Sequence, residues 1–285
     1  EVLNAKGYQT SFFHAGETGT MAFDAYCKNA GVSNYYGLED YPNEKEDFDG
    51  YWGIYDEPYL QYFSKELNKM KQPFFSSVFT LSSHHPYSIP QKHLNRFKKG
   101  TLKVHETIGY TDYALKQFFN TAKNEKWFKN TLFVLTADHP AQSEYKYYKI
   151  NSGRYKVPLL FYDPNGKLKG SSNIISKHAD IPATILSLLG DSSTFVSFGQ
   201  DLFAPEENIV VNYRNNQYLI RNNHFSMVFN GDIATQFYTS EDSLWRQNLV
   251  ENIEFKTAKD SLLIFGKAYI QQYNNRLIQN KLYIE

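Results

Sequence analysis

The sequence lacks several features that would assign it to a class at once. It has one cysteine, Cys27, so no disulfide can form within the chain; this fits a reducing compartment and equally an exported domain that needs no disulfides. No run approaches the roughly 18 apolar residues of a transmembrane helix, and the first residues lack a signal-peptide pattern. Thirty basic residues balance thirty acidic ones, so no overall field favours nucleic acid or an anionic membrane, and we expect no nucleic-acid partner. Any anion must therefore be bound locally.

Several catalytic motifs are also absent. The sequence has no glycine-rich phosphate loop, no G-x-S-x-G turn and no H-E-x-x-H helix. These absences argue against P-loop NTPases, α/β-hydrolases and zincins. No Ser or Thr lies in an evident strand-to-helix nucleophile turn, so we expect a metal-activated nucleophile to lie outside this chain. The opening residues resemble the end of a helix followed by a strand, which predicts a piece of a longer polypeptide.

Short apolar stretches alternate with longer amphipathic ones through residue 205. We expect strands at residues 10–14, 73–81, 131–136 and 157–162, and helices near residues 57–71, 102–124 and 181–189. This alternation predicts an α/β fold in which helices flank a sheet, with parallel pairing as the default. Apolar residues recur at helical spacing near 102–124, and we expect this face to pack on the sheet: Ile108, Leu115, Phe118, Phe119 and Ala122.

A different pattern follows residue 205. Polar-flanked strands are expected at residues 209–213, 217–221, 225–229 and 236–239, joined by turns that contain Asn and Gly. A last amphipathic helix is expected near residues 258–275. We therefore predict a core at 1–205 and a small antiparallel meander with a helix at 206–285.

The dipeptide Asp138-His139 directly follows a strand expected to be buried and parallel. Ligands in open α/β sheets bind beyond the carboxyl ends of the strands. An adjacent carboxylate and imidazole can both turn toward one cation, and they suit Zn or Mn. Without the strand, a loop Asp that caps a turn would be the better interpretation.

Further histidines lie at strand ends or helix starts. His84 and His85 follow the strand at 73–81, and either could donate to a phosphate oxygen or carry a proton. His14 ends the first strand beside glycines. His178 precedes Asp180, which is expected to cap the next helix. Each alone is more often structural; together they indicate a site. Three other histidines are interpreted as solvated: His93, His105 and His224.

The ordered set of motifs resembles the lipoteichoic acid synthase-like branch of the sulfatase and alkaline phosphatase superfamily. The motifs are Gly7 to His14, Trp52 to Pro58, Thr80 to His84, Gly109 to Ala114, Asp138-His139, Val157 to Leu159, His178 to Thr184 and Phe198 to Leu202. The resemblance implies an alkaline phosphatase-like sheet flanked by helices. It also implies a membrane-anchored protein whose catalytic domain lies on the extracytoplasmic face of the cell membrane, with a nucleophilic threonine and an acidic metal ligand upstream of residue 1.

The same resemblance assigns roles to individual residues. Asp138 and His139 resemble metal ligands, usually for manganese, with Mg, Zn or Ca as alternatives. His84 resembles a catalytic histidine that contacts the phosphoglycerol group, and His14 and His178 resemble substrate-pocket histidines. The implied reaction transfers a phosphoglycerol-type head group from a phospholipid through a covalent threonine intermediate.

The sequence departs from the synthases after His14. Residues 19–24 read Gly-Thr-Met-Ala-Phe-Asp where the synthases have a Phe-Trp-Asn-Arg run that binds glycerol phosphate. Two alternatives therefore stay open: a sulfatase or phosphodiesterase that hydrolyses anionic esters, and an inactive binding fragment.

Overall fold

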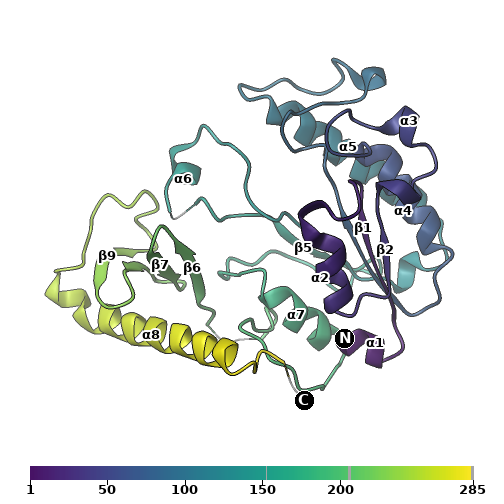
Figure 1. Ribbon diagram of the computed structural model, residues 1–285. Coiled ribbons are helices and arrows are strands. Elements are labelled where there is room, and N and C mark those ends of the chain that lie inside the picture. Colours follow the sequence, from purple (N-terminus) through teal and green to yellow (C-terminus); the bar gives the residue numbers. More distant parts are fainter. Residues whose placement is uncertain (152, 205–206, 284–285) are drawn as a thin grey trace. The chain divides into compact units, whose positions relative to one another are not determined.

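The computed structural model describes residues 1–151, 153–204 and 207–283, and these divide into two compact units (Figure 1). Unit 1 comprises Glu1–Ala137 and Pro158–Leu168; unit 2 comprises Asp138–Val157 and Lys169–Glu285. The predicted boundary between residues 205 and 206 lies outside the described residues and stays a prediction.

Unit 1 contains a three-stranded parallel sheet in the order β2-β1-β3. Its strands are β1 (Gln9–His14), β2 (Asn34–Tyr36) and β3 (Phe74–Phe79). The helices of this unit are α1 (Val2–Ala5), α2 (Phe23–Asn29), α3 (Glu44–Asp47), α4 (Asp56–Leu67) and α5 (Val104–Ala122). Short 3-10 turns are formed by Thr20–Ala22, Leu38–Asp40, Gln91–His93 and Phe128–Asn130. The predicted α/β architecture with a parallel sheet is confirmed.

The strand before Asp138-His139 pairs differently from the prediction. β4 (Phe133–Thr136) pairs antiparallel with β5 (Leu159–Tyr162), and β4 is half-buried with Thr136 exposed. The expectation of a buried parallel strand is therefore wrong. A parallel return needs a crossover of a dozen or more residues, usually a helix. Among the described residues between β4 and β5 the only helix is the four-residue α6 (Lys146–Lys149).

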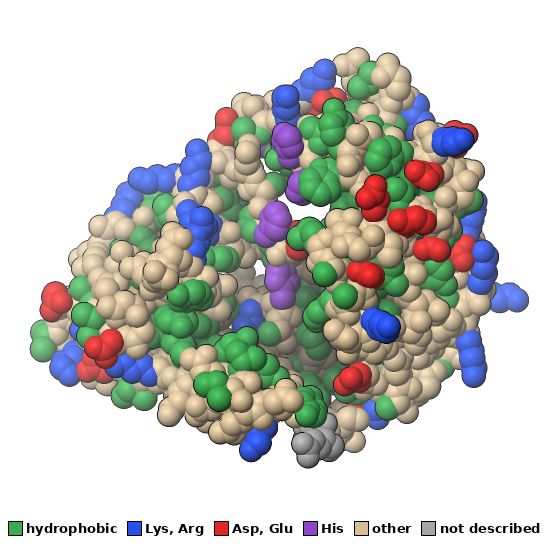
Figure 2. All heavy atoms as spheres, in the orientation of Figure 1, with side chains coloured by type: hydrophobic (Ala, Val, Ile, Leu, Met, Phe, Trp, Pro, Cys, Tyr) green, Lys and Arg blue, Asp and Glu red, His purple; other side chains and the backbone are tan. Residues whose placement is uncertain are grey.

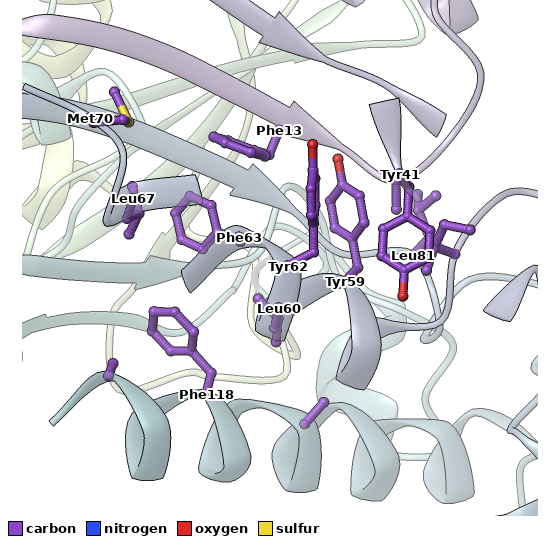
Figure 3. Close-up of a cluster of buried hydrophobic side chains, with 14 of the residues drawn as sticks. Phe13, Tyr41, Tyr59, Leu60, Tyr62, Phe63, Leu67, Met70, Leu81 and Phe118 are labelled. Carbon is purple, nitrogen blue, oxygen red and sulfur yellow. The ribbon is translucent and has the colours of Figure 1, made fainter. Parts of the chain in front are cut away.

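Helix α4 forms the centre of the core of unit 1. Its Phe63 packs edge-on against Phe13 of β1, with ring centroids 4.9 Å apart, and stacks on Phe118 of α5 at 5.8 Å (Figure 3). Aromatic pairs of this kind add to the stabilisation that burial provides. Phe118 is buried as predicted, but Ile108 is 49% exposed. The buried face of α5 contains Thr107 and Tyr110, and Ile108 lies outside it.

Unit 2 contains helix α7 (Asp180–Leu188) and an antiparallel meander in the order β6-β7-β8-β9. The strands are β6 (Val210–Arg214), β7 (Gln217–Arg221), β8 (Phe225–Phe229) and β9 (Ala234–Thr239). The 3-10 turn Ile253–Phe255 leads into α8 (Lys256–Ile278), which runs along the meander in Figure 1. A Cβ at Gly266 would collide with Cδ1 of Ile220, so this glycine allows the close approach of helix and sheet. The predicted meander and final helix are confirmed.

No helix in the described part of the chain is both long enough and apolar enough to span a membrane.

Candidate active site

His14 is the last residue of β1, and only 2% of it is exposed. Its ring lies edge-on to Phe23, with centroids 5.1 Å apart, and burial lowers the pKa of the imidazole, which is therefore neutral at pH 7. The Tyr35 hydroxyl lies 3.3 Å from Nδ1, and burial raises the pKa of that phenol to about 12. The phenol keeps its proton and can donate to Nδ1, and we adopt the tautomer of His14 in which it does. The imidazole proton of His14 then resides on Nε2.

Gly16 brings the end of β1 against the loop that carries Trp52. It forms an antiparallel bridge with Gly53. A Cβ at Gly16 would lie 2.8 Å from Cε1 of His14 and 2.9 Å from the carbonyl oxygen of Trp52. Only glycine allows the backbone to pass this close to the imidazole.

Trp52 connects this loop to the histidines that follow β3. Its indole Nε1 donates to the carbonyl of His85 at 2.6 Å, and its ring lies edge-on to His84, with centroids 4.6 Å apart. Nδ1 of His84 lies 2.9 Å from the same carbonyl oxygen. A carbonyl only accepts, so Nδ1 carries a hydrogen, and a neutral His84, an exposed residue, has its lone pair on Nε2.

A buried carboxylate anchors the loop that carries His84. Asp56, 1% exposed, accepts hydrogen bonds at Oδ1 from the backbone N–H groups of Leu81 and Ser82, both at 2.9 Å. Its Oδ2 accepts from the Thr111 hydroxyl at 2.6 Å. Burial raises the pKa of Asp56, and these hydrogen bonds lower it in part. The loop is thus fixed to the start of α4, and His84 projects from it into solvent.

Asp138 and His139 form a compact pair of donors in unit 2. Asp138 Oδ2 lies 3.3 Å from His139 Nε2, and the side chains are 52% and 69% exposed. Asp138 Oδ1 accepts the backbone N–H of His139 at 2.8 Å, while Nδ1 of His139 lies 3.0 Å from the carbonyl oxygen of Pro140. That carbonyl requires a hydrogen on Nδ1. The lone pair of a neutral His139 therefore faces the carboxylate.

Two facing lone pairs repel unless a proton or a cation lies with them, so the pair can bind a proton or serve as two ligands of a divalent ion. Two ligand atoms that each lie about 2.1 Å from one ion are separated by about 3.0 to 3.4 Å in octahedral or tetrahedral geometry. The 3.3 Å separation is within that range. The bond from Nδ1 to a carbonyl is the usual support of a metal-binding histidine. Among the described residues, no group of three or more His, Cys, Asp or Glu side chains is arranged to hold a metal ion.

His178 is exposed beside another buried aspartate. Asp180 is 0% exposed, and it accepts hydrogen bonds from the Lys177 backbone at 2.8 Å, the Gln200 backbone at 3.0 Å and the Asn208 amide at 2.7 Å. The ammonium of Lys177 lies 2.9 Å from Oδ1. The expected N-cap role of Asp180 is wrong: α7 begins at Asp180, and its carboxylate joins three chain segments.

His93 corrects another expectation. It is 5% exposed instead of solvated, and its Nε2 lies 2.8 Å from Glu57 Oε2. Arg96 donates to Nδ1 at 3.2 Å, which places the imidazole proton on Nε2, facing the carboxylate. Sequence reasoning missed this pair and the roles of Asp56 and Tyr35, because their partners lie more than 20 residues away along the chain.

The predicted residues thus fall into groups within each unit. In unit 1, His14 and His84 are connected through Gly16 and Trp52. In unit 2, Asp138 and His139 lie together, and His178 lies two residues before the buried Asp180. The role of each residue in catalysis or binding stays a prediction.

Comparisons with known proteins define the fold and family. A crystal structure of an alkaline phosphatase superfamily protein from Vibrio parahaemolyticus superposes with a TM-score of 0.76 at 25% identity, covering 95% of this chain and 68% of that one. The lipoteichoic acid synthase LtaP from Listeria monocytogenes gives 0.73 at 18% identity, covering 95% and 72%. The chain therefore has the alkaline phosphatase superfamily fold, as predicted.

The sulfatase family model matches residues 1–191, and the chain belongs to the sulfatase family. Lipoteichoic acid synthase 1 from Bacillus subtilis is 27% identical over 263 residues, which cover 85% of this chain and 38% of that protein. Lipoteichoic acid synthase from Staphylococcus aureus is 26% identical over 238 residues, covering 77% and 37%. The chain thus spans less than two fifths of these relatives. Family membership indicates an enzyme, and the predicted resemblance to lipoteichoic acid synthases is confirmed.

Proposed function

We propose that this chain is part of a metal-dependent transferase that moves a phosphoglycerol-type head group from a phospholipid to an acceptor hydroxyl. The observation that supports it most is the pair of donor atoms on Asp138 and His139, 3.3 Å apart with the lone pair of His139 facing the carboxylate. The similarity to lipoteichoic acid synthases across most of the chain supports the choice of a phosphoglycerol group over sulfate. The proposal places the protein at the extracytoplasmic face of the membrane.

In this proposal the nucleophilic threonine and the remaining ligands lie outside the 285 residues of the sequence. Asp138 and His139 would hold a divalent ion, most simply manganese, and the ion would supply positive charge that activates a hydroxyl and neutralises phosphate oxygens. The threonine oxygen forms a bond to phosphorus while the bond from phosphorus to the lipid oxygen breaks. An acceptor hydroxyl then forms a bond to phosphorus, and the bond to threonine breaks.

The two unit 1 histidines suit different tasks in these steps. His14 is neutral and has its hydrogen on Nε2, so it is a hydrogen-bond donor to a non-bridging oxygen of the transferred group. His84 has Nε2 as its free nitrogen. When charged it can give a proton to the lipid leaving group in the first step, and when neutral it can accept the proton of the acceptor hydroxyl in the second. Tyr35 and Asp56 are positioning residues for these two histidines.

The test uses the longer protein that contains these residues. It measures release of diacylglycerol from a phosphatidylglycerol analogue and hydrolysis of an aryl sulfate side by side. We expect turnover of the lipid analogue only, and a loss of about 100-fold or more in kcat for His84→Gln. The matched control is His224→Gln, which changes an exposed histidine of unit 2 and should keep full activity. Turnover of the sulfate ester alone would make the protein a sulfatase and overturn the proposal.

A further inference from the structure

The zero net charge of the chain conceals a separation of charge within unit 1. Residues 39–49 contain six acidic side chains and one lysine, and acidic side chains gather on part of unit 1 in Figure 2. By contrast, no acidic residue occurs between Glu66 and Glu106. We call residues 91–103, which lie between these two glutamates, the basic segment. It carries five cations: Lys92, Arg96, Lys98, Lys99 and Lys103. All five are exposed.

The rings of Phe97 and His93 anchor the basic segment to the body of unit 1. Phe97 packs against Tyr110 and Tyr113 of α5, with ring centroids 5.8 Å apart in both cases. His93 is buried and bonded to Glu57, and the guanidinium of Arg96 lies over the Tyr113 ring, 4.0 Å from its centroid. The backbone of the segment is therefore held against α5, so binding of a partner has to order the cationic side chains but not the chain that carries them.

Most of this charge is unpaired by acidic groups. Lys92 lies 3.0 Å from Glu57, which offsets one positive charge. In the described residues, the other four cations form no ion pair with a carboxylate: Arg96, Lys98, Lys99 and Lys103. Lys99 donates to the side chain of Asn95 at 3.0 Å, which is a neutral partner. A net positive surface thus remains available to an anion.

An apolar side chain lies exposed among these cations. Leu94 is 49% exposed although its neighbour His93 is buried. Asn95 adopts a positive φ of 62°, a turn that lies between Leu94 and Arg96. Basic side chains around an exposed leucine are typical of surfaces that contact anionic lipid, where the cations meet the head groups and the apolar group enters the acyl boundary.

We propose that the basic segment is a docking surface for an anionic phospholipid bilayer. Leu94 favours a bilayer over a dissolved polyanion, and this choice also rests in part on the phospholipid substrate of the proposed function. The contact holds unit 1 on the membrane at the segment that follows His84. Docking increases the local concentration of lipid substrate without requiring a residue of the segment in the chemistry.

Co-sedimentation of the 285-residue chain with vesicles tests the docking surface. We expect binding to vesicles of phosphatidylcholine and phosphatidylglycerol, weak binding to phosphatidylcholine alone, and loss of binding as salt rises. Each lysine removed near an anionic surface lowers binding about fivefold, so K98Q/K99Q/K103Q should lower it about 100-fold. The matched control K116Q/K123Q/K126Q removes the same charge from exposed positions near α5 and should lower it less than about fivefold.

Leu94→Ala separates a bilayer from a dissolved polyanion. We expect it to weaken vesicle binding and leave binding to polyphosphate unchanged. Equal binding to both vesicle types, equal losses in the two triple variants, or no effect of Leu94→Ala on vesicle binding would each overturn the proposal. Turnover of a water-soluble phosphoglycerol ester by the longer protein is measured separately. If the longer protein does not turn over this ester while vesicle binding is intact, the proposed function is wrong and the docking surface is still supported.

Discussion

Asp56 and Ser82 are joined by a reciprocal pair of hydrogen bonds. Oδ1 of Asp56 accepts the backbone N–H of Ser82 at 2.9 Å, and Oγ of Ser82 accepts the backbone N–H of Asp56 at 3.0 Å. Both residues are buried. The start of α4 and the loop that carries His84 are thus fixed to each other two residues before the histidine.

Asp56→Asn should destabilise unit 1 by about 1 to 3 kcal/mol, because an amide replaces one of the two acceptor oxygens with a donor. Urea unfolding measures this loss. Asp112→Asn, an exposed change on α5, is the matched control and should be close to neutral. In the longer protein, Asp56→Asn should lower kcat more than it changes KM. Equal unfolding midpoints for the two variants would show that the carboxylate does not hold the loop.

Gly16→Ala should displace His14. The new Cβ would meet Cε1 of His14 at 2.8 Å and the carbonyl oxygen of Trp52 at 2.9 Å, and the backbone carbonyl has little freedom to move. We expect a loss of about 1 to 3 kcal/mol in the free energy of unfolding and a fall in kcat/KM. The control Gly109→Ala should change the free energy of unfolding little. Its new Cβ makes a tight 3.3 Å contact with Phe97, which opposes the preference of α5 for alanine. Full activity in Gly16→Ala would contradict the assigned place of His14.

Glu57→Gln should make stability depend less on pH. Burial alone raises the pKa of Glu57, but hydrogen bonds from His93 and Lys92 hold that pKa below its ordinary value of 4.5. A lowered carboxyl pKa stabilises the fold above the unfolded-state pKa, and this contribution is lost as pH falls through the folded-state pKa. We expect Glu57→Gln to cost about 2 kcal/mol at pH 7 and progressively less in acid.

Unfolding of wild type and Glu57→Gln between about pH 7 and pH 3 measures that difference. The exposed Glu44→Gln serves as control. A difference between wild type and Glu57→Gln that stays constant with pH would show that the charge of Glu57 has no part in the Glu57–His93 contact.

Local patterns predicted most of the longer elements but missed α2, β2 and α3. The strands at 217–221 and 225–229 match β7 and β8 at both ends, because alternating side chains and turns that contain Asn or Gly are local signals. The direction of β4 was missed, since pairing depends on how the chain returns after residue 137. The sequence also predicts that histidines follow β1 and β3, because a polar residue after an apolar run can be recognised from the sequence alone.

The supporting residues could not be predicted in this way. Tyr35 meets His14 across 21 residues of chain, and Asp180 meets Asn208 across 28. Hydrogen bonds between distant segments leave no periodic pattern in the sequence. A buried aspartate such as Asp56 has the same local context as a surface aspartate at the start of a helix, so only the fold separates the two.

The most direct test of the account is the affinity of the longer protein for Mn²⁺, measured by equilibrium dialysis. Asp138→Ala and His139→Ala should each weaken binding by at least about tenfold, because each removes one donor of the facing pair. The control His224→Ala should bind as the wild type does. If both site variants keep the wild-type affinity, Asp138 and His139 do not hold the ion, and the proposed mechanism is wrong.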